Sequence, residues 1–327
     1  MSIIKAYDVA YPRFRAPDLA LMRSFLRDFG MLDAQVDEDR LFMRGYGDSP
    51  FLHVTERAPV AEFAGFGIWV NDIADLENLA AHDGVAVEDL DAPGGGKVVR
   101  LRDPDGFLVE AVAGQTKATP ADQGAREAWN QFGAESPRKG VLRRVVQGPA
   151  HVQRLGHIVL GVSNFRASEA WYKERFGLVT SDEIQPVPGV AIGAFLRCDR
   201  GDQPCDHHTI FLLERPMPPS FMHSAYEVAD MDDLMTGHEY LKKASYSHAW
   251  GVGRHYLGSQ VFDYWKDPFG NEIEHWTDGD RLITADGGGI QSIPELLGVQ
   301  WGPNMPGFDE IEAAMAAAFA AGPAPQE

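Results

Sequence analysis

The pattern of apolar and polar residues repeats along the chain. Residues 154–178 contain a short apolar run, a loop and an amphipathic stretch that ends in Phe176-Gly177. Residues 7–31 follow the same pattern and end in Phe29-Gly30. A short apolar run is typical of a strand and an amphipathic stretch of a helix, and glycine often follows the last residue of a helix. Each half of the chain is therefore predicted to begin with a strand and a helix.

The later parts of the two halves also match. An Asp-Pro-x-Gly turn separates two strand-like runs at 99–112 and again at 263–276, which predicts one hairpin in each half. Residues 51–59 resemble 210–218. Residues 67–80 resemble 225–238, where an apolar strand runs into a helix with aspartate at its N-cap. The order β-α-β-β-β, twice in each half, predicts an α+β fold of two tandem modules with short antiparallel strands.

These repeats set the expected domain boundaries. An N-terminal module covers residues 1–114 and a C-terminal module covers residues 151–280. The polar residues 115–150 are expected to form a linker, with room for a helix near 124–132. Residues 281–327 are expected to form a tail that is first rich in glycine and proline and then ends in a helix at 309–321.

Composition narrows the class of protein. The formal net charge of −19 argues against nucleic acid and against an anionic membrane as partners. The chain has only two cysteines and no CxxC spacing, which argues against a disulfide framework. No signal-peptide pattern or membrane-spanning run is evident. A soluble cytoplasmic enzyme with a small, uncharged or modestly charged substrate is expected.

Two histidines and one glutamate on three predicted strands form a candidate metal site. Aligning the helix ends places Ala10 opposite His157, and Gly65 corresponds to His223, so only the second module carries the imidazoles. Glu274 has the counterpart Glu110, so the carboxylate alone is not diagnostic. Two histidines and one carboxylate leave half of an octahedral shell open, which suits oxygen chemistry at Fe(II). The same ligand set also suits Mn(II).

Other side chains cluster around this set in the sequence. Tyr264 and Glu274 flank one hairpin turn symmetrically, so they are expected to lie opposite each other on one sheet face. The matching pair in the first module, Arg100 and Glu110, is expected to be an ion pair. His208 follows His207, which is interpreted as a polar strand entry, and His255 follows a glycine-rich stretch. No ligand role is predicted for the remaining histidines, which are His53, His82, His151, His238 and His275.

The second half of the chain resembles the catalytic module of type I extradiol ring-cleaving dioxygenases of the vicinal oxygen chelate superfamily. The resemblance is carried by an ordered set of motifs: LGHIVL, the His207-His208 pair, FMHSAYEV, GVGRH and DYWKDPFGNEIE. It implies the glyoxalase-like fold, with mixed antiparallel sheets curled around the metal. Residue by residue it implies metal ligation by His157, His223 and Glu274, acid/base chemistry by His208 beside the oxygen site, and catalytic contact with the substrate by His255 and Tyr264.

The implied reaction is cleavage of a catechol-type ring beside its two hydroxyls, with Fe(II) and O2, in the catabolism of aromatic compounds. The first module is expected to be non-catalytic. In the biphenyl-diol branch an Asn-Asp pair usually follows the GVGRH motif, whereas Tyr256-Leu257-Gly258 follow here, so the ring substituents remain open. His248 is placed in the substrate pocket, although a surface loop fits it equally well.

Two alternatives and one further expectation complete this interpretation. A glyoxalase-like isomerase or a metal-dependent resistance protein would use the same scaffold, but it has no evident need for His208, His255 and Tyr264 together. A non-catalytic protein could hold an aromatic ligand on the scaffold. The inactive first module and the C-terminal helix offer surfaces for assembly into a homo-oligomer.

Overall fold

The computed structural model describes residues 2–310 and 313, apart from residues 125, 127, 131, 134 and 135. The first module contains the predicted β-α-β-β-β order twice. Its helices are α1 (Leu19–Asp28) and α2 (Ile73–Asp83). Its strands are β1 (Ala6–Ala16), β2 (Leu32–Val36), β3 (Arg40–Arg44), β4 (His53–Arg57), β5 (Glu62–Val70), β6 (Val87–Asp89), β7 (Lys97–Arg102) and β8 (Leu108–Ala113).

The second module repeats this order and adds short elements. Its helices are α3 (Phe165–Phe176), α4 (Met231–Lys243) and α5 (Ile293–Leu297), with a 3-10 turn at Thr284–Asp286. Its strands are β9 (Val152–Val162), β10 (Val179–Ile184), β11 (Gly193–Arg197), β12 (Cys205–Asp206), β13 (Ile210–Glu214), β14 (Ser220–Val228), β15 (Ser247–His255), β16 (Val261–Lys266), β17 (Glu272–Thr277), β18 (Arg281–Leu282), β19 (Gly289–Gln291) and β20 (Val299–Trp301). The α+β prediction is confirmed.

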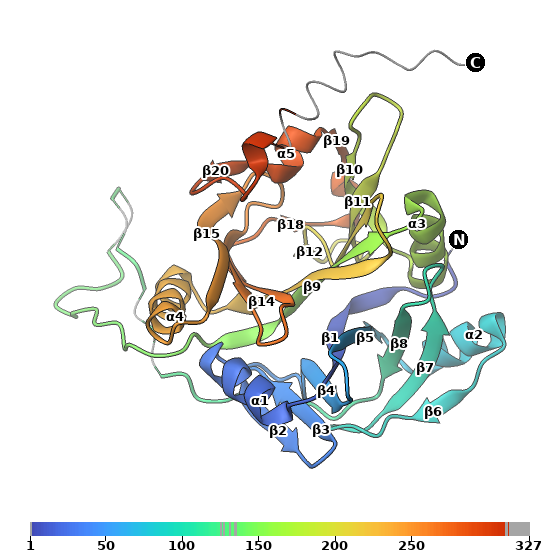
Figure 1. The fold of residues 1–327 in the computed structure, drawn as a ribbon, viewed down its shortest axis with the longest axis horizontal. Coiled ribbons are helices and arrows are strands. Elements are labelled where there is room, and N and C mark those ends of the chain that lie inside the picture. Colours follow the sequence, from blue (N-terminus) through green and yellow to red (C-terminus); the bar gives the residue numbers. More distant parts are fainter. Residues whose placement is uncertain are drawn as a thin grey trace.

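Each module is built on one mixed sheet. The strand order is β2-β3-β4-β1-β5-β8-β7-β6 in the first and β19-β10-β11-β13-β9-β14-β17-β16-β15-β20 in the second. The two units of a module meet through an antiparallel pair, β1 with β5 and β9 with β14. Within a unit the first and last strands pair in parallel, as β9 with β13 and β14 with β17. The expected strands are therefore only partly antiparallel. In Figure 1 the first module (blue to cyan) lies below the second (green to red).

Side-chain caps explain where the helices begin. Asp72 and Asp230 accept hydrogen bonds from backbone amides of the first turns of α2 and α4, as the Asp-capped pattern predicts. Asn164 caps α3 in the same way. Gly177 ends α3 in the left-handed conformation, with φ of 64°. The repeat in the sequence thus reflects local start and stop signals that act in both modules.

The segment after residue 281 is more than a tail. β19 pairs with β10, and β20 pairs with β15, so residues 289–301 add a strand to each edge of the second sheet. Figure 1 shows α5 and β20 above β15. These strands are three residues long, too short for a periodic pattern, which is why the sequence did not indicate them. The expected C-terminal helix begins at Phe308, and most of it lies outside the described residues.

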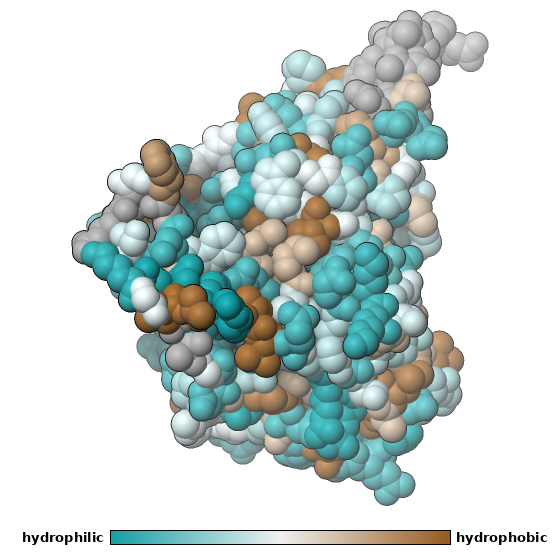
Figure 2. All heavy atoms as spheres, turned by 90° about the vertical axis from the view of Figure 1, so that its left-hand side faces the viewer, coloured by the Kyte–Doolittle hydropathy of each residue, from teal (hydrophilic) through white to brown (hydrophobic). Residues whose placement is uncertain are grey.

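The linker crosses one side of the molecule without forming the helix expected near 124–132, as far as its described residues show. Several of its apolar side chains are exposed, including Trp129, Leu142 and Val146. Figure 2 shows the side on which the linker lies, where brown apolar groups stand beside teal hydrophilic ones. No helix in the described part of the chain is long and apolar enough to cross a membrane.

The two modules share a buried junction. His275 of β17 donates to the carbonyl of Phe29 at 2.6 Å, and the two rings stack with centroids 3.7 Å apart. His53 of the first module lies 3.2 Å from the hydroxyl of Tyr226 in β14. His53 is 2% exposed, and burial lowers its pKa to about 3. The junction therefore contains an imidazole that stays neutral while the protein is folded.

This imidazole predicts an acid-sensitive fold. The pKa of His53 is about 3 when folded and about 6.5 when unfolded, so the unfolded state binds the proton more readily below pH 6.5. We expect the free energy of unfolding to fall as the pH drops from about 6.5 towards 3, by up to about 1.4 kcal/mol per pH unit from this residue. Urea unfolding at pH 7 and pH 5 measures it. If His53→Gln shows the same loss between these pH values as the wild type, the assignment is wrong.

Candidate metal centre and active site

One row of residues crosses the second sheet and carries the candidate site. His157 on β9 lies opposite Ala225 on β14, and Ala225 lies opposite Glu274 on β17. Residues directly opposite each other in a sheet share a face. His223 stands two residues before Ala225 and so points to that face as well. Ala225 has only a methyl group, which leaves space above β14 for the imidazole and the carboxylate to approach each other.

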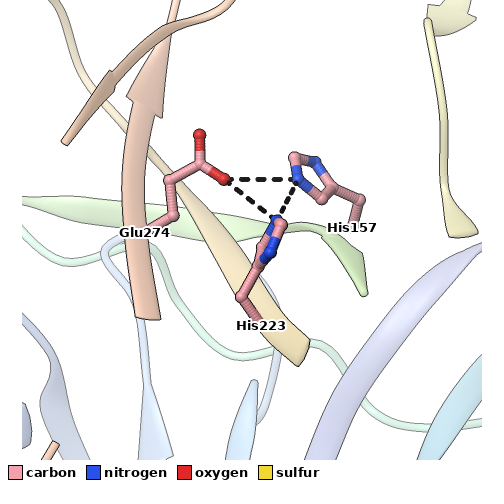
Figure 3. A group of neighbouring side chains, drawn as sticks. All are labelled: His157, His223 and Glu274. Atoms are coloured by element: carbon pink, nitrogen blue, oxygen red, sulfur yellow. Dashed lines mark hydrogen bonds and ion pairs between the residues drawn. The ribbon is translucent and has the colours of Figure 1, made fainter. Parts of the chain in front are cut away.

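The three predicted ligands converge at one point (Figure 3). The Nε2 atoms of His157 and His223 are 3.4 Å apart. The Oε2 atom of Glu274 lies 3.3 Å from the first nitrogen and 3.4 Å from the second. His157 is 3% exposed and Glu274 is fully buried. Three ligand atoms from three strands therefore form a nearly equilateral triangle in the interior of the module.

The chemistry of this triangle fits a divalent metal. Neither oxygen of the Glu274 carboxylate accepts a hydrogen bond. A buried carboxylate that accepts no hydrogen bond is strongly destabilising, and a bound cation would compensate its charge. Burial lowers the pKa of His223 to about 3, so this imidazole is neutral and offers a lone pair instead of a positive charge. Metal–ligand bonds of about 2.1 Å would place adjacent ligand atoms of an octahedron about 3.0 Å apart, close to the observed spacing.

A second group with two histidines and one carboxylate provides a contrast. His238, His248 and Asp263 also bring their ligand atoms within 4.8 Å of one another. Here, however, both carboxylate oxygens accept hydrogen bonds: His248 donates to Oδ1 at 2.8 Å and Trp265 to Oδ2 at 2.6 Å. The N–H groups of His248 and Trp265 already satisfy the carboxylate of Asp263, so this group needs no metal. His238 thus belongs to a cluster that the sequence did not reveal.

The same cluster moves His248 away from the predicted pocket. His248 lies opposite Trp265, next to Tyr264 in the chain, and therefore on the other face of the sheet. The row that contains Glu274 continues instead through Tyr264 to Trp250. Trp250 stacks on Tyr264 with ring centroids 5.4 Å apart. A register shift between His248 and Trp250 hides this arrangement from the sequence.

Tyr264 and His255 lie beside the ligand triangle, as expected. The predicted register is confirmed, because Tyr264 pairs directly with Glu274. The hydroxyl of Tyr264 lies 3.0 Å from Nε2 of His255, and its ring packs edge-on against His223. Burial and the nearby Glu274 carboxylate raise the pKa of Tyr264 well above its usual value. Tyr264 therefore keeps its proton and can donate it in a hydrogen bond.

His208 covers another side of the triangle. Its ring lies over that of His157 with centroids 3.9 Å apart and meets the edge of Phe195. Burial, followed by the neighbouring His157 and His207, lowers the pKa of His208 well below its usual value. His207 was interpreted as a polar strand entry, yet it is buried and lies 3.2 Å from His208, Nδ1 to Nδ1. The adjacency of the two histidines was the only signal for this contact in the sequence.

The first module shows what replaced its ligands. Its equivalent row runs from Tyr11 through Gly67 and Glu110 to Arg100. By sheet register the counterpart of His157 is therefore Tyr11, and the predicted counterpart Ala10 is wrong. Counting back from the helix ends fails because α3 is longer than α1. The N-caps Asp18 and Asn164 give the correct alignment, since each lies seven residues after the row.

In the first module an arginine takes the place of the two imidazoles beside the glutamate. Arg13 lies opposite Gly65, the counterpart of His223, and donates to Oε2 of Glu110 from Nε at 3.0 Å and from Nη2 at 2.8 Å. Tyr11 donates to the same oxygen at 3.1 Å, and Arg100 donates to Oε1 at 3.0 Å. The predicted ion pair between Arg100 and Glu110 is confirmed. A guanidinium cation thus compensates the buried carboxylate of the first module.

A large cavity lies elsewhere and does not point to the chemistry. It measures ≈ 720 Å³, is lined by both modules, and includes Asp8, Arg154 and Arg281 but none of the three candidate ligands. Arg154 and Arg281 both pair with Asp206 at the cavity wall, at 2.6 and 3.3 Å. The converging donor atoms, and not the largest dimensions of a cavity, therefore mark the candidate site.

A sequence-family profile matches most of the module that holds this candidate site. The profile of the Glyoxalase/Bleomycin resistance protein/Dioxygenase superfamily matches residues 154–275. The second module belongs to this superfamily. Over longer stretches the chain is 28% identical to metapyrocatechase 2 of Cupriavidus necator, covering 92% of this chain and 91% of that protein. It is 27% identical to the iron-dependent extradiol dioxygenase of Rhodococcus jostii, covering 84% and 90%.

Solved structures of a dioxygenase and of a glyoxalase share the fold. The homoprotocatechuate 2,3-dioxygenase of Arthrobacter globiformis superposes with a TM-score of 0.73 at 19% identity, covering 90% of this chain and 86% of that chain. The Mn(II)-bound glyoxalase of Novosphingobium aromaticivorans gives the same TM-score at 22% identity, covering 93% of each chain. The two-module arrangement is therefore common to dioxygenases and a glyoxalase, and fold alone does not separate them.

Proposed function

We propose that the protein is an extradiol dioxygenase that cleaves the ring of a catechol-type diol next to its two hydroxyls. The observation that carries the proposal is the buried carboxylate of Glu274, which accepts no hydrogen bond and lies in a triangle with His157 and His223. Its curated relatives are named as metapyrocatechases and an iron-dependent extradiol dioxygenase, which supports the reaction class and the metal. The presence of His208, His255 and Tyr264 around the same triangle favours oxygen chemistry over isomerisation.

Each side chain has a role in this reaction. His157, His223 and Glu274 would hold Fe(II), or Mn(II), which when bound supplies positions for both diol oxygens and for dioxygen. Tyr264 and His255, 3.0 Å apart, would hydrogen-bond the diol oxygens and orient the ring. His208, held neutral by burial, would accept a proton at one step and return it at a later one.

The surroundings of the row favour a planar, uncharged ring as substrate. Trp250 stacks on Tyr264, and Phe262 stacks on His255 with centroids 4.0 Å apart, so apolar ring faces border the polar contacts. Tyr256, after the GVGRH motif, is half exposed.

The test is oxygen uptake. The protein is loaded with Fe(II) under anaerobic conditions and mixed in air with a panel of monocyclic, substituted and bicyclic catechols. Consumption of O2 together with a yellow ring-opened product is expected for at least one diol. If no diol gives either signal with fully loaded protein, the proposal fails. An isomerase would instead turn over without consuming oxygen.

His208→Ala separates chemistry from binding. We expect iron content and diol affinity to stay near those of the wild type, because His208 is not one of the proposed ligands. We expect kcat to fall on the order of 100-fold, the usual contribution of a positioned acid/base group. Single-turnover kinetics with the best diol of the panel measures this. Loss of iron from His208→Ala would show that the residue has been given the wrong role.

Assembly and location are also proposed. Exposed apolar linker residues such as Leu142 and Val146 support a homo-oligomer, which sedimentation of the full chain would detect. A cytoplasmic location agrees with the reduced, buried Cys198 and Cys205. The formal net charge of −19 argues against nucleic acid as a partner.

A further inference from the structure

Behind His208 lies a chain of hydrogen-bonded groups that the proposed mechanism does not use. His208 contacts His207 through Nδ1 of both rings at 3.2 Å. The Nε2 atom of His207 lies 2.7 Å from Oδ2 of Asp182 on β10. The other oxygen of that carboxylate, Oδ1, accepts from Nε2 of Gln291 on β19 at 2.8 Å. The side chains of His208, His207 and Asp182 are all buried.

The order of donors along this chain follows from Asp182. Burial alone would raise the pKa of Asp182, but hydrogen bonds from His207 and Gln291 hold it below its usual value, so the carboxylate is ionised. An ionised carboxylate only accepts, so Nε2 of His207 must carry a proton. When Nε2 carries the only ring proton of His207, its Nδ1 atom has a lone pair, and Nδ1 of His208, 3.2 Å away, donates to it. The Nε2 atom of His208 is left without a proton.

We infer that Asp182 and His207 are positioning residues that hold His208 in the tautomer with a free lone pair on Nε2, ready to take a proton from the substrate. This inference deepens the proposed function and rests on it. The carboxylate–imidazole contact also fixes the plane of the His207 ring, and Ser181, next to Asp182, donates to the backbone carbonyl of His207 at 2.5 Å. The neighbouring strand therefore positions both ends of His207.

The C-terminal segment completes the arrangement. Gly289 lies opposite Asp182 in the parallel pair of β10 and β19, and a Cβ atom there would stand 2.5 Å from Oδ1 of Asp182. Only glycine lets β19 approach closely enough for Gln291 to reach the carboxylate. Because Gln291 donates to Oδ1, the two oxygens of Asp182 face different partners, and this asymmetry makes the inference testable.

Asp182→Asn is expected to reverse the tautomer. Gln291 holds the amide oxygen of the new side chain at the Oδ1 position, so its NH2 group faces Nε2 of His207. His207 must then donate through Nδ1, and His208 becomes protonated on Nε2. We expect kcat to fall on the order of 100-fold, while KM stays within about twofold and iron content is unchanged, because neither residue touches metal or diol.

A spectroscopic signature distinguishes this role from a merely structural one. ¹⁵N NMR of histidine-labelled full-length protein loaded with diamagnetic Zn(II) reports the tautomer of His208, assigned with His208→Ala. We expect a protonated Nδ1 in the wild type and a protonated Nε2 in Asp182→Asn. The matched control is Asp233→Asn, in which another buried carboxylate that contacts an imidazole, here His151 at 2.7 Å, becomes an amide in the first turn of α4. The control is expected to keep both kcat and the His208 tautomer.

Two results would overturn the inference. One is an Asp182→Asn variant whose kcat equals that of the wild type. The other is a wild-type His208 that is already protonated on Nε2. If the wild type cleaves no diol at all, the proposed function fails, and the tautomer measurement, which needs no turnover, still decides whether Asp182 and His207 orient His208.

Discussion

His157→Ala is expected to lower iron affinity on the order of 100-fold or more and to reduce ring cleavage to background. The variant removes one corner of the ligand triangle and leaves His223 and Glu274, two ligands from neighbouring strands, to hold the ion. Two measurements test this. Atomic absorption spectroscopy gives the iron content after desalting, and oxygen uptake with the best catechol gives the turnover. Both should fall together.

The matched control is His82→Ala. His82 lies near the end of α2 in the first module with 42% of its side chain exposed, so its removal should change neither iron content nor turnover. Full iron content in His157→Ala, with a folded protein by circular dichroism, would contradict the ligand assignment. Loss of iron in both variants would point to a general loss of structure instead.

Arg13→Val is expected to destabilise the first module by about 3 kcal/mol, the lower end of the cost of breaking a buried ion pair. Valine stands at the corresponding position of the second module, Val159, which lies opposite His223. The side chains of Arg13 and Glu110 are 11% and 1% exposed, so the variant leaves a buried carboxylate with only Arg100 and Tyr11 as partners. Urea unfolding of the iron-loaded protein gives the free energy.

Arg15→Ala is the control on the same strand. Arg15 pairs with Glu62 at 2.6 Å, but both side chains are about half exposed, so the loss should stay within about 0.5 kcal/mol. Equal losses in Arg13→Val and Arg15→Ala would show that Arg13 does not compensate a buried charge. Turnover of both variants should remain near that of the wild type at temperatures where they are folded, because the proposed site lies in the other module.

Local signals made much of the fold predictable. The Asp-Pro-x-Gly turns set the register of the hairpins, and this was enough to place Tyr264 opposite Glu274. N-cap aspartates and C-terminal glycines marked helix ends in both modules. The convergence of His157, His223 and Glu274 could be expected because the repeat showed which module carries imidazoles.

The features that were missed depend on non-local geometry. Asp182 and His207 meet only because β10 and the turn before β13 are brought together in the sheet, and no sequence spacing indicates this contact. A register shift in β15 places His248 and Trp250 on opposite faces of the sheet. Trp250, and not His248, therefore lies on the face that carries Tyr264 and Glu274. Tyr11 was misaligned by one residue because the two helices that follow the first strands differ in length.

The position of β19 and β20 has a consequence for how the protein is made. A chain emerging from the ribosome has all three proposed ligands once residue 274 is out, and domains generally fold in the order of synthesis. Gln291, which orients Asp182, and β20, which pairs with the strand of His255, arrive later. During translation the three proposed ligands are thus in place before Gln291 can orient Asp182. The arrangement around His208 and His255 is complete only when the segment up to Trp301 has paired with both edges of the sheet.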